Sequence, residues 1–384
     1  MKQRVLLGLS GGVDSAVTAL LLKKQGYEVV GAFIRCFSEE KNKVTGECSW
    51  IEDKKEAQKI SALLNIKLID LNYEKEYAKN VIKPMFKDYA KGKTPNPDSL
   101  CNKTIKFPYL WEEAKKHKCN FIATGHYIKK ILRPYNFLDV QSGRKHFGIK
   151  KIRKGNKYYL KIPKDKSKDQ SYFLYQLTQK DLEHTLFPIG DYTKTQIRKI
   201  AKQNNLPNWN RQGTRGLCFV GNINMKEFLK QKIKNKPGII KNPEGKPIGK
   251  HNGIMFYTIG ERLGENKEIT INQEYRDKTN SKLYVSSKNI KKNELIVAPK
   301  NHQALLKNKF KLKNINWITK KPNLNKELYV RIRHLGNLTK AKIAKKGNQI
   351  ICTLKTPTKG LAQGQTAIIY TKQGIILGGG EITY

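Results

Sequence analysis

Cysteine is scarce in this sequence, and its few copies lie far apart. The chain has 384 residues and 6 cysteines: Cys36, Cys48, Cys101, Cys119, Cys218 and Cys352. Disulfide-stapled domains and zinc modules need closely spaced cysteines, and the sequence contains no CxxC pair. The spacing therefore excludes both classes, and we expect reduced thiols in a cytoplasmic protein.

Long apolar runs are also missing. No segment approaches the roughly 18 apolar residues of a membrane-spanning helix, and the N-terminus lacks the apolar stretch of a signal peptide. Hydrophobic residues still make up 38% of the chain, which is enough to bury real cores. The sequence thus predicts a globular protein without a membrane anchor. Its length exceeds what one core usually reaches, so we expect two or three domains.

Acidic residues are the third shortage. The chain has 31 Asp and Glu against 76 Lys and Arg, which gives a formal net charge of +45. A surplus of this size attracts polyanions, because protein cations release the counterions that condense on a nucleic acid. Nucleic acid is therefore the first class of partner to consider.

Strands and helices alternate in the first third of the chain. Apolar runs predict strands at 4–9, 28–34, 66–71 and 121–127, and helical spacing predicts helices at 16–26, 53–65 and 109–118. Such alternation predicts an α/β fold with a parallel sheet and helices on both faces. Ligands of such sheets bind at the carboxyl ends of the strands.

The pattern changes after about residue 200. Gly, Pro and Asn punctuate 235–255, and short strands alone are predicted near the end, at 327–335, 349–354, 366–372 and 374–379. We predict an α/β domain over 1–205, a small central domain over 206–294, and a C-terminal β-barrel-like domain over 295–384.

A glycine turn directly follows the first predicted strand. The segment consists of Gly8, Leu9, Ser10, Gly11, Gly12, Val13, Asp14 and Ser15. The two adjacent glycines let the backbone approach a ligand, and the amides of the following helix N-terminus favour a pyrophosphate. Asp14 is a candidate ligand for Mg²⁺. The Lys-Ser/Thr ending of a Walker loop is absent, and a plain βα turn capped by Asp14 is the alternative.

Two other segments carry cysteines in unusual surroundings. "TPNPDSLCNKTIKF" at 94–107 contains Asp98 and Cys101 after two prolines that fix an extended approach. "RGLCFVG" places Cys218 near Arg215, and a thiol beside a positive charge can be a reactive thiolate. Taken alone, either cysteine is more consistent with a small buried residue than with a reactive thiol.

These segments occur in a specific order together with "ATGHY" at 123–127, "KDQSYFLYQL" at 168–177 and "LFPIG" at 186–190. In that order they resemble the tRNA-specific 2-thiouridylases, which are PP-loop ATP pyrophosphatases. The resemblance runs from residue 5 to the strings "GQTAIIY" and "LGGGEI" near the end. It implies a Rossmann-like PP-loop domain at the N-terminus and conversion of the wobble uridine of certain tRNAs to 2-thiouridine.

The resemblance also implies roles for individual residues. Cys101 matches the nucleophile of the family, Cys218 the cysteine that carries a persulfide, and Asp98 is placed to exchange a proton at the base. The residues expected to bind ATP are Gly8 through Ser15, Ile34 and Gly125. Those expected to contact tRNA are Asn96, Pro97, Asp98, His126, Lys168, Asp169, Gln170, Arg331, Ile332, Arg333 and Gln365.

The chemistry that the family performs explains these residue types. Uridine C2 is an unreactive carbonyl, so ATP first adenylates its oxygen and sulfur then displaces AMP. The sulfur comes from Cys218, either as the persulfide or as released hydrosulfide, and attack by Cys101 leaves a transient Cys101–Cys218 disulfide. We expect ATP and Mg²⁺ as cofactors, tRNA and a persulfide donor or relay protein as partners, and a monomer. The loop before Cys218, "RQGTRGLC", lacks the usual Lys-Asp-Ser run of the family, so what activates Cys218 stays open.

Two other functions are consistent with parts of the sequence. A PP-loop synthetase with a small-molecule acceptor would need neither Cys101 nor Cys218, and a basic RNA-binding protein with a relic nucleotide fold would not need an intact loop. The segment 129–168 is longer than the family carries, with 14 Lys and Arg against Asp139 and Asp165. It is either a solvated loop or an arm that contacts RNA.

Overall fold

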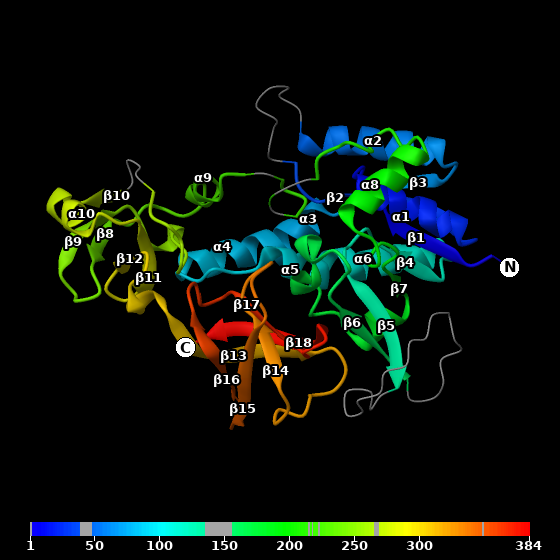
Figure 1. Ribbon diagram of the computed structural model, residues 1–384. Coiled ribbons are helices and arrows are strands. Elements are labelled where there is room, and N and C mark those ends of the chain that lie inside the picture. The colour runs from blue at the N-terminus through cyan, green and yellow to red at the C-terminus, as the bar shows by residue number, and fades with distance from the viewer. Residues whose placement is uncertain are drawn as a thin grey trace.

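The computed structural model describes residues 2–38, 48–134, 156–213, 216, 218–221, 223–264, 269–347 and 349–384. Three sheets organise these residues, and Figure 1 shows them as three regions: an α/β region, a second sheet beside it, and a barrel below. The predicted fold class, a parallel α/β domain followed by a small central domain and a β-barrel-like domain, is confirmed.

The first sheet is parallel and has the strand order β3-β2-β1-β4-β7. Its strands are β1 (Arg4–Gly8), β2 (Glu28–Arg35), β3 (Lys67–Asn72), β4 (Phe121–Ala123) and β7 (Thr185–Leu186). Apolar side chains cover both faces, because parallel strands are buried on both sides. One face packs on α1 (Val13–Lys24), α2 (Ser49–Leu63) and α8 (Lys194–Gln203). The opposite face packs on α6 (Phe107–Lys116).

Two long helical runs each contain a π-helical turn. The first consists of α3 (Glu74–Tyr77), the π turn η1 (Ala78–Ile82) and α4 (Lys83–Ala90). The second consists of α5 (Pro97–Cys101), the π turn η2 (Asn102–Lys106) and α6. A π turn widens the helix and changes which side chains share a face, and such turns are frequent at functional sites. Further short helices are η4 (Lys166–Lys168), η5 (Ser171–Phe173), α7 (Gln179–Glu183), α9 (Met225–Lys230), η6 (Ile254–Phe256), α10 (Gln273–Thr279) and η7 (Gln303–Leu305).

The second sheet has the order β10-β9-β8-β12-β11. Its strands are β8 (Gly238–Lys241), β9 (Pro247–His251), β10 (Ile269–Ile271), β11 (Leu283–Asn289) and β12 (Glu294–Pro299). All pairs are antiparallel except β8 with β12. Strand β12 continues to Pro299, so the domain boundary expected between 294 and 295 falls inside a strand of this sheet.

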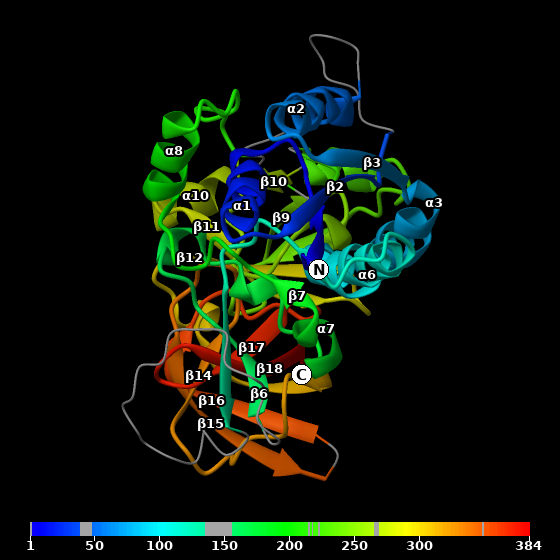
Figure 2. The same ribbon diagram turned by 90° about the vertical axis from the view of Figure 1, so that its right-hand side faces the viewer.

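The third sheet closes into a barrel, because β13 pairs with both β16 and β18. Around the barrel, β13 (Lys307–Trp317) is followed by β16 (Gln349–Thr358), β15 (Thr339–Lys346), β14 (Leu328–Arg331), β17 (Thr366–Tyr370) and β18 (Ile375–Thr383). The hairpin of β5 (Lys129–Pro134) and β6 (Asn156–Lys161) adds to this sheet through β18, as Figure 2 shows from the side. Two strands from the first half of the chain thus extend the C-terminal barrel.

Most predicted elements agree with the structure, and one strand is shorter than expected. Strand β4 ends at Ala123, whereas the sequence predicted a strand to 127. The reason is Gly125, where a Cβ atom would lie 2.9 Å from the backbone nitrogen of Ser15. The chain leaves the sheet there to pack on the start of α1. Within the described residues, no helix has the length and apolarity needed to cross a membrane.

Candidate active site

The phosphate loop is a local structure between β1 and α1. Gly11 has φ +74°, and a Cβ atom at this position would lie 2.2 Å from the carbonyl oxygen of Asp53. Only glycine fits this conformation and this space. The carbonyl of Gly11 accepts hydrogen bonds from Asn208 Nδ2 at 2.8 Å and from Arg211 Nη1 at 3.3 Å. The loop is therefore held open at the N-terminus of α1, where helix amides attract an anion.

Two serine side chains shape the same loop. The backbone nitrogen of Ser10 donates to Ser15 Oγ at 3.2 Å, and the two hydroxyl oxygens lie 3.3 Å apart. Ser15 Oγ also donates to the carbonyl of Gly12 at 3.0 Å. Both hydroxyls can turn to a phosphate oxygen, since a hydroxyl rotates to suit its partner.

Asp14 lies in the first turn of α1 and has two partners that the sequence analysis missed. Both of its carboxylate oxygens lie 2.7 Å from Lys194 Nζ, and the hydroxyl of Tyr127 donates to Oδ1 at 2.7 Å. Burial and the Asp14 carboxylate raise the pKa of Tyr127, so the phenol stays protonated. Lys194 is the first residue of α8, and a lone lysine at a helix start gives no sequence signal for this contact.

Asp14 is consistent with a magnesium site formed together with a nucleotide. Magnesium usually keeps several waters and binds through one or two carboxylates plus substrate phosphates, so a single carboxylate beside a phosphate loop is sufficient. The described part of the chain contains no cluster of three or more His, Cys, Asp or Glu that could hold a metal alone. Ligation by Asp14 would require Lys194 to release one carboxylate oxygen.

The second part of the site joins two cysteines from distant segments. Cys101 ends α5 and is fully buried, and its sulfur lies 3.9 Å from that of the partly buried Cys218. Both are free thiols. Lys106, the last residue of η2, places its ammonium group 3.4 Å from Cys218 Sγ. The wide turn of η2 thus brings Cys101 and Lys106 to the same sulfur, although they lie on one helical run.

The two thiols differ in acidity. A hydrogen bond from Cys101 and the charge of Lys106 outweigh burial and lower the pKa of Cys218 to about 7. Burial and the neighbouring Cys218 raise the pKa of Cys101 well above its usual value. Burial alone would lower the pKa of Lys106, but the two thiols and Asp98 outweigh burial and raise it. Ionisation of the pair is therefore favoured at Cys218 and disfavoured at Cys101, with the charged Lys106 beside them.

Asp98 and Tyr77 fix the backbone of Cys218 from two sides. The backbone nitrogen of Cys218 donates to Asp98 Oδ1 at 2.8 Å, and the hydroxyl of Tyr77 donates to the Cys218 carbonyl at 2.6 Å. Burial raises the pKa of Asp98. Asn96 caps α5 by accepting from the nitrogen of Ser99 at 3.1 Å, and Pro97 occupies the first helical position, where a missing N–H costs nothing. Asp98 thus contacts the loop of Cys218 directly.

The phosphate loop and the cysteine pair meet at the carboxyl ends of β4 and β2. Gly125 packs on the backbone of Ser15, and the next residue, His126, stacks on the ring of Phe107 with centroids 5.9 Å apart. Burial and the nearby Lys106 lower the pKa of His126 well below its usual value, so this imidazole is neutral. Ile34, near the end of β2, belongs to the same hydrophobic cluster as Cys101. The site therefore lies at the strand edge where α/β sheets bind ligands.

The residues expected to contact tRNA divide into buried and accessible groups. Asp169 is fully buried and pairs with Arg331, Oδ2 to Nη1, at 2.5 Å. Gln170 accepts a hydrogen bond from the Tyr127 nitrogen at 2.8 Å. The Asp169–Arg331 pair joins the barrel to the first domain, whereas the Gln170–Tyr127 hydrogen bond lies within that domain. The buried positions are His126, Asp169, Arg331 and Ile332, the partly exposed ones are Asn96, Pro97, Asp98, Gln170 and Gln365, and the exposed ones are Lys168 and Arg333.

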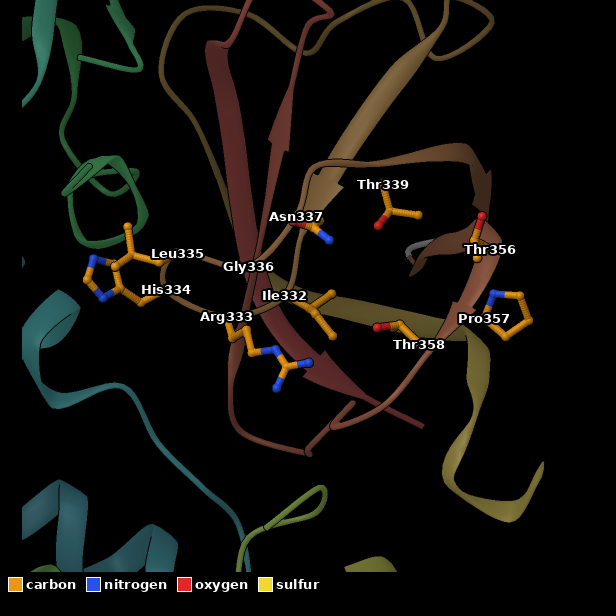
Figure 3. A pocket seen from close by; sticks show the side chains of 10 residues that line it. All are labelled: Ile332, Arg333, His334, Leu335, Gly336, Asn337, Thr339, Thr356, Pro357 and Thr358. Atoms are coloured by element: carbon orange, nitrogen blue, oxygen red, sulfur yellow. The ribbon is translucent and has the colours of Figure 1, made fainter. Parts of the chain in front are cut away.

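A surface depression lies beside Arg333 on the barrel (Figure 3). Its volume is about 460 Å³, and it is lined by Ile332 to Asn337, Thr339 and Thr356 to Thr358. The sequence analysis gave His334 no role, yet its Nε2 lies 2.9 Å from the carbonyl of Asp169 and its ring lies 4.5 Å from that of Phe173. His334 therefore contributes to the contact between the barrel and the catalytic domain.

Two predicted features lie outside the described residues. Arg215, which the sequence placed near Cys218, is one of them. The other is the middle of the basic segment 129–168, from 135 to 155. The ends of that segment form β5 and β6.

Three family models match consecutive parts of the chain. They are the tRNA methyl transferase HUP domain over residues 3–222, the tRNA methyl transferase PRC-barrel domain over 226–299, and the aminomethyltransferase beta-barrel domain over 307–382. A protein of Aliarcobacter butzleri named tRNA-specific 2-thiouridylase MnmA 2 is 34% identical over 100% of this chain and 98% of its own length. The chain belongs to the tRNA-specific 2-thiouridylase family.

Further members of the 2-thiouridylase family match to the same extent. The MnmA proteins of Nitrosomonas europaea and Mycoplasma genitalium are 36% and 37% identical, over 99% and 98% of this chain and 98% of their own lengths. The first family model covers both the phosphate loop and Cys218. The 2-thiouridylase family thus shares the whole length over which this site is assembled.

Proposed function

We propose that this protein is an ATP-dependent sulfurtransferase that replaces O2 of the wobble uridine of tRNA by sulfur. The observation that carries the proposal is the cysteine pair, with sulfurs 3.9 Å apart beside a phosphate loop. Membership of the 2-thiouridylase family supports the same reaction.

The phosphate loop would serve the activation step. ATP phosphates would bind at the start of α1, among the backbone amides and the hydroxyls of Ser10 and Ser15. Uridine O2 attacks the α-phosphorus, the bond to the β-phosphate oxygen breaks, and pyrophosphate leaves. Asp14, together with phosphate oxygens, would hold Mg²⁺, which supplies positive charge beside the phosphates. Lys194 adds a second cation at the same place.

The cysteine pair would serve the sulfur step. Cys218, with its low pKa, is suited to take a sulfur atom from a persulfide donor. Either the Cys218 persulfide attacks C2 of the activated uridine, or Cys101 first releases hydrosulfide from it; in both cases AMP leaves. Formation of the Cys101–Cys218 disulfide needs little movement, because the two sulfurs already lie 3.9 Å apart. A dithiol reductant then restores both thiols.

The substrate base must reach the site from a folded RNA. Extrusion costs a few kcal/mol and is least costly in a single-stranded loop, which favours the anticodon loop as the target. The net charge of +45 favours phosphate contacts, and Lys168 and Arg333 are exposed near the site. We propose that these two residues contact tRNA, that Gln170 and Gln365 contribute polar contacts, and that the enzyme acts as a cytoplasmic monomer.

A nucleoside assay tests the proposed function. Unmodified tRNA is incubated with the protein, ATP, Mg²⁺ and a sulfide source, then digested and analysed by mass spectrometry. We expect 2-thiouridine that depends on ATP and appears at the wobble position. ATP consumption without any thiolated nucleoside would overturn the proposal and point to a different acceptor.

A further inference from the structure

Lys106 contacts the sulfur of Cys218 with its charged group, and the sequence motifs give this lysine no role. Its ammonium group lies 3.4 Å from Sγ, and its side chain is partly buried. Within the described residues, no carboxylate forms an ion pair with Lys106. An ammonium group in this position needs a negative partner, and the nearest candidate atom is the sulfur itself.

The loop that carries Cys218 stabilises the contact between the Lys106 ammonium group and the Cys218 sulfur. Phe219 has φ +65°, a conformation that non-glycine residues rarely adopt, and its ring lies 5.2 Å from Lys106 Nζ. The same ring packs edge to face on Tyr77 at 6.0 Å. The ring therefore covers one side of the ammonium group while Cys218 Sγ contacts it on another.

We propose that Lys106 is a positioning residue for sulfur transfer, holding Cys218 as a thiolate oriented toward Cys101 and the incoming sulfur donor. This inference rests on the proposed function and assigns to Lys106 the ionisation and orientation of Cys218, the residue that would carry the sulfur. It also gives a role to the helical run: η2 sets Cys101 and Lys106 on one face, so both groups contact the same sulfur.

Sulfur moves from the donor through Cys218 by two exchanges of S–S bonds. The Cys218 thiolate attacks the outer sulfur of a donor persulfide; a new S–S bond forms on Cys218, the S–S bond of the donor breaks, and the donor leaves as a thiolate. In the hydrosulfide route, the Cys101 sulfur attacks Cys218 Sγ, the bond from Sγ to the outer sulfur breaks, and the Cys101 proton passes to that outer sulfur, which leaves as hydrosulfide. The positive charge of Lys106 compensates the negative charge at Sγ in the first step and on the leaving sulfur in the second.

Alkylation of Cys218 as a function of pH tests the proposal without tRNA or ATP. The rate of labelling by iodoacetamide is followed by mass spectrometry of the Cys218 peptide. Groups that face Cys218 from the packed elements are Cys101 and Asp98 on α5, Lys106 on η2, Tyr77 on α3 and Cys36 after β2. In the wild type, half of the maximal rate is expected near neutral pH.

Substitution at position 106 separates charge from packing. We expect Lys106→Met to shift the profile upward by at least about one pH unit, so labelling at slightly acidic pH slows about tenfold. Lys106→Arg keeps the charge and should stay within a few tenths of a unit of the wild type. The matched control is Lys103→Met, which removes an exposed lysine of the same π turn and should leave the profile unchanged.

A Lys106→Met profile that coincides with the wild type would overturn the proposal, as would an equal shift in Lys103→Met. ATP affinity reports folding of each variant, and Lys106→Gln replaces the Met variant if the latter does not fold. Failure of the proposed function is distinguishable: a shifted profile in a protein that makes no 2-thiouridine keeps the thiolate assignment but removes its role in tRNA thiolation.

Discussion

The phosphate loop and the cysteine pair are built in opposite ways. All the backbone groups expected to meet ATP phosphates belong to one turn between β1 and α1. The cysteine pair instead joins residues 97–106 to residues 218–219, and Tyr77 from a third segment holds it in place. A loop that depends on local backbone geometry can be recognised from adjacent residues. A site that depends on tertiary contacts cannot, and its supporting groups become visible only in the fold.

The difference also predicts that the two halves can be damaged separately. We expect phosphate binding to depend on the conformation of one turn and on the Asp14–Lys194–Tyr127 contacts. We expect sulfur handling to depend on Lys106, Asp98 and the backbone of Cys218. They share the ends of β4 and β2 but no side chain. The following predictions, from the largest expected effect to the smallest, test whether this separation holds.

Removal of either thiol should abolish the sulfur half alone. Cys101→Ser and Cys218→Ser are each expected to eliminate 2-thiouridine while ATP binding stays at the wild-type level, because no phosphate-loop contact involves either sulfur. Nucleoside mass spectrometry and ATP titration measure the two outcomes. Cys119→Ser, at a buried cysteine elsewhere in the same domain, is the control. Near-normal thiolation in either variant would show that the pair is not the sulfur relay.

Removal of Asp14 should abolish the phosphate half alone. We expect Asp14→Ala to lower pyrophosphate release about a hundredfold, since the carboxylate proposed to hold Mg²⁺ beside the phosphates is lost. Excess sulfide should not rescue thiolation, because an added nucleophile cannot replace activation of the carbonyl. Labelling of Cys218 should be unchanged. Asp70→Asn, at an exposed carboxylate of the same domain, serves as the control, and undiminished pyrophosphate release in Asp14→Ala would contradict the assignment.

The glycine turn offers a test of how closely the loop packs against α2. In Gly11→Ala the new Cβ would meet the Asp53 carbonyl at 2.2 Å, so the turn must shift. A displacement that costs about 1.4 kcal/mol weakens binding about tenfold, and we expect at least this loss of ATP affinity. Gly26→Ala shares the positive φ but has open space around the new atom, so its strain should leave ATP affinity intact. Equal effects of the two substitutions would show that strain, not the clash in the loop, is responsible.

The smallest effect that we expect is a difference in pH dependence between sulfur transfer and pyrophosphate release. Cys218 has a pKa lowered to about 7, so its thiolate form is lost as the pH falls through that value. Sulfur transfer from a persulfide donor should therefore slow about threefold between about pH 7.5 and 6.5. Pyrophosphate release should change less over the same range. Stopped assays of the two products measure this, and parallel profiles would argue against a Cys218 thiolate.

The sequence predicted one half of the site far better than the other. Gly11, Asp14 and Ser15 lie in one turn after a strand, and the structure places them together. The resemblance brought Cys101 and Cys218 together, and the structure places their sulfurs 3.9 Å apart. Lys106 lies within the segment 94–107, but nothing in the sequence suggested a role for it. The π turn that directs its side chain toward Cys218 leaves no pattern in the residue types.

Other contacts were beyond sequence reasoning for a similar reason. Asp169 and Arg331 were expected at the RNA surface, yet they form a buried pair across the barrel and the first domain. Charged residues are mostly exposed, so we expected both side chains at the surface. The sequence pattern does not show that each has a buried partner far along the chain. The hairpin of β5 and β6 was likewise read as part of the first domain, because only pairing with β18 assigns it to the barrel.

That pairing has a consequence for how the chain is made. Strand β6 can pair with β18 only after β18 has been synthesised, and in this pairing Lys161 lies opposite Ile375. The same strand β18 closes the barrel by pairing with β13. During synthesis the first domain is complete long before this last strand leaves the ribosome, so the hairpin keeps an unpaired edge until the chain ends. The final strand therefore completes both the hairpin edge of β6 and the C-terminal barrel. A chain that stops before residue 375 would leave the edges of β6, β13 and β17 open, with a risk of aggregation, even though every residue of the catalytic loops is present.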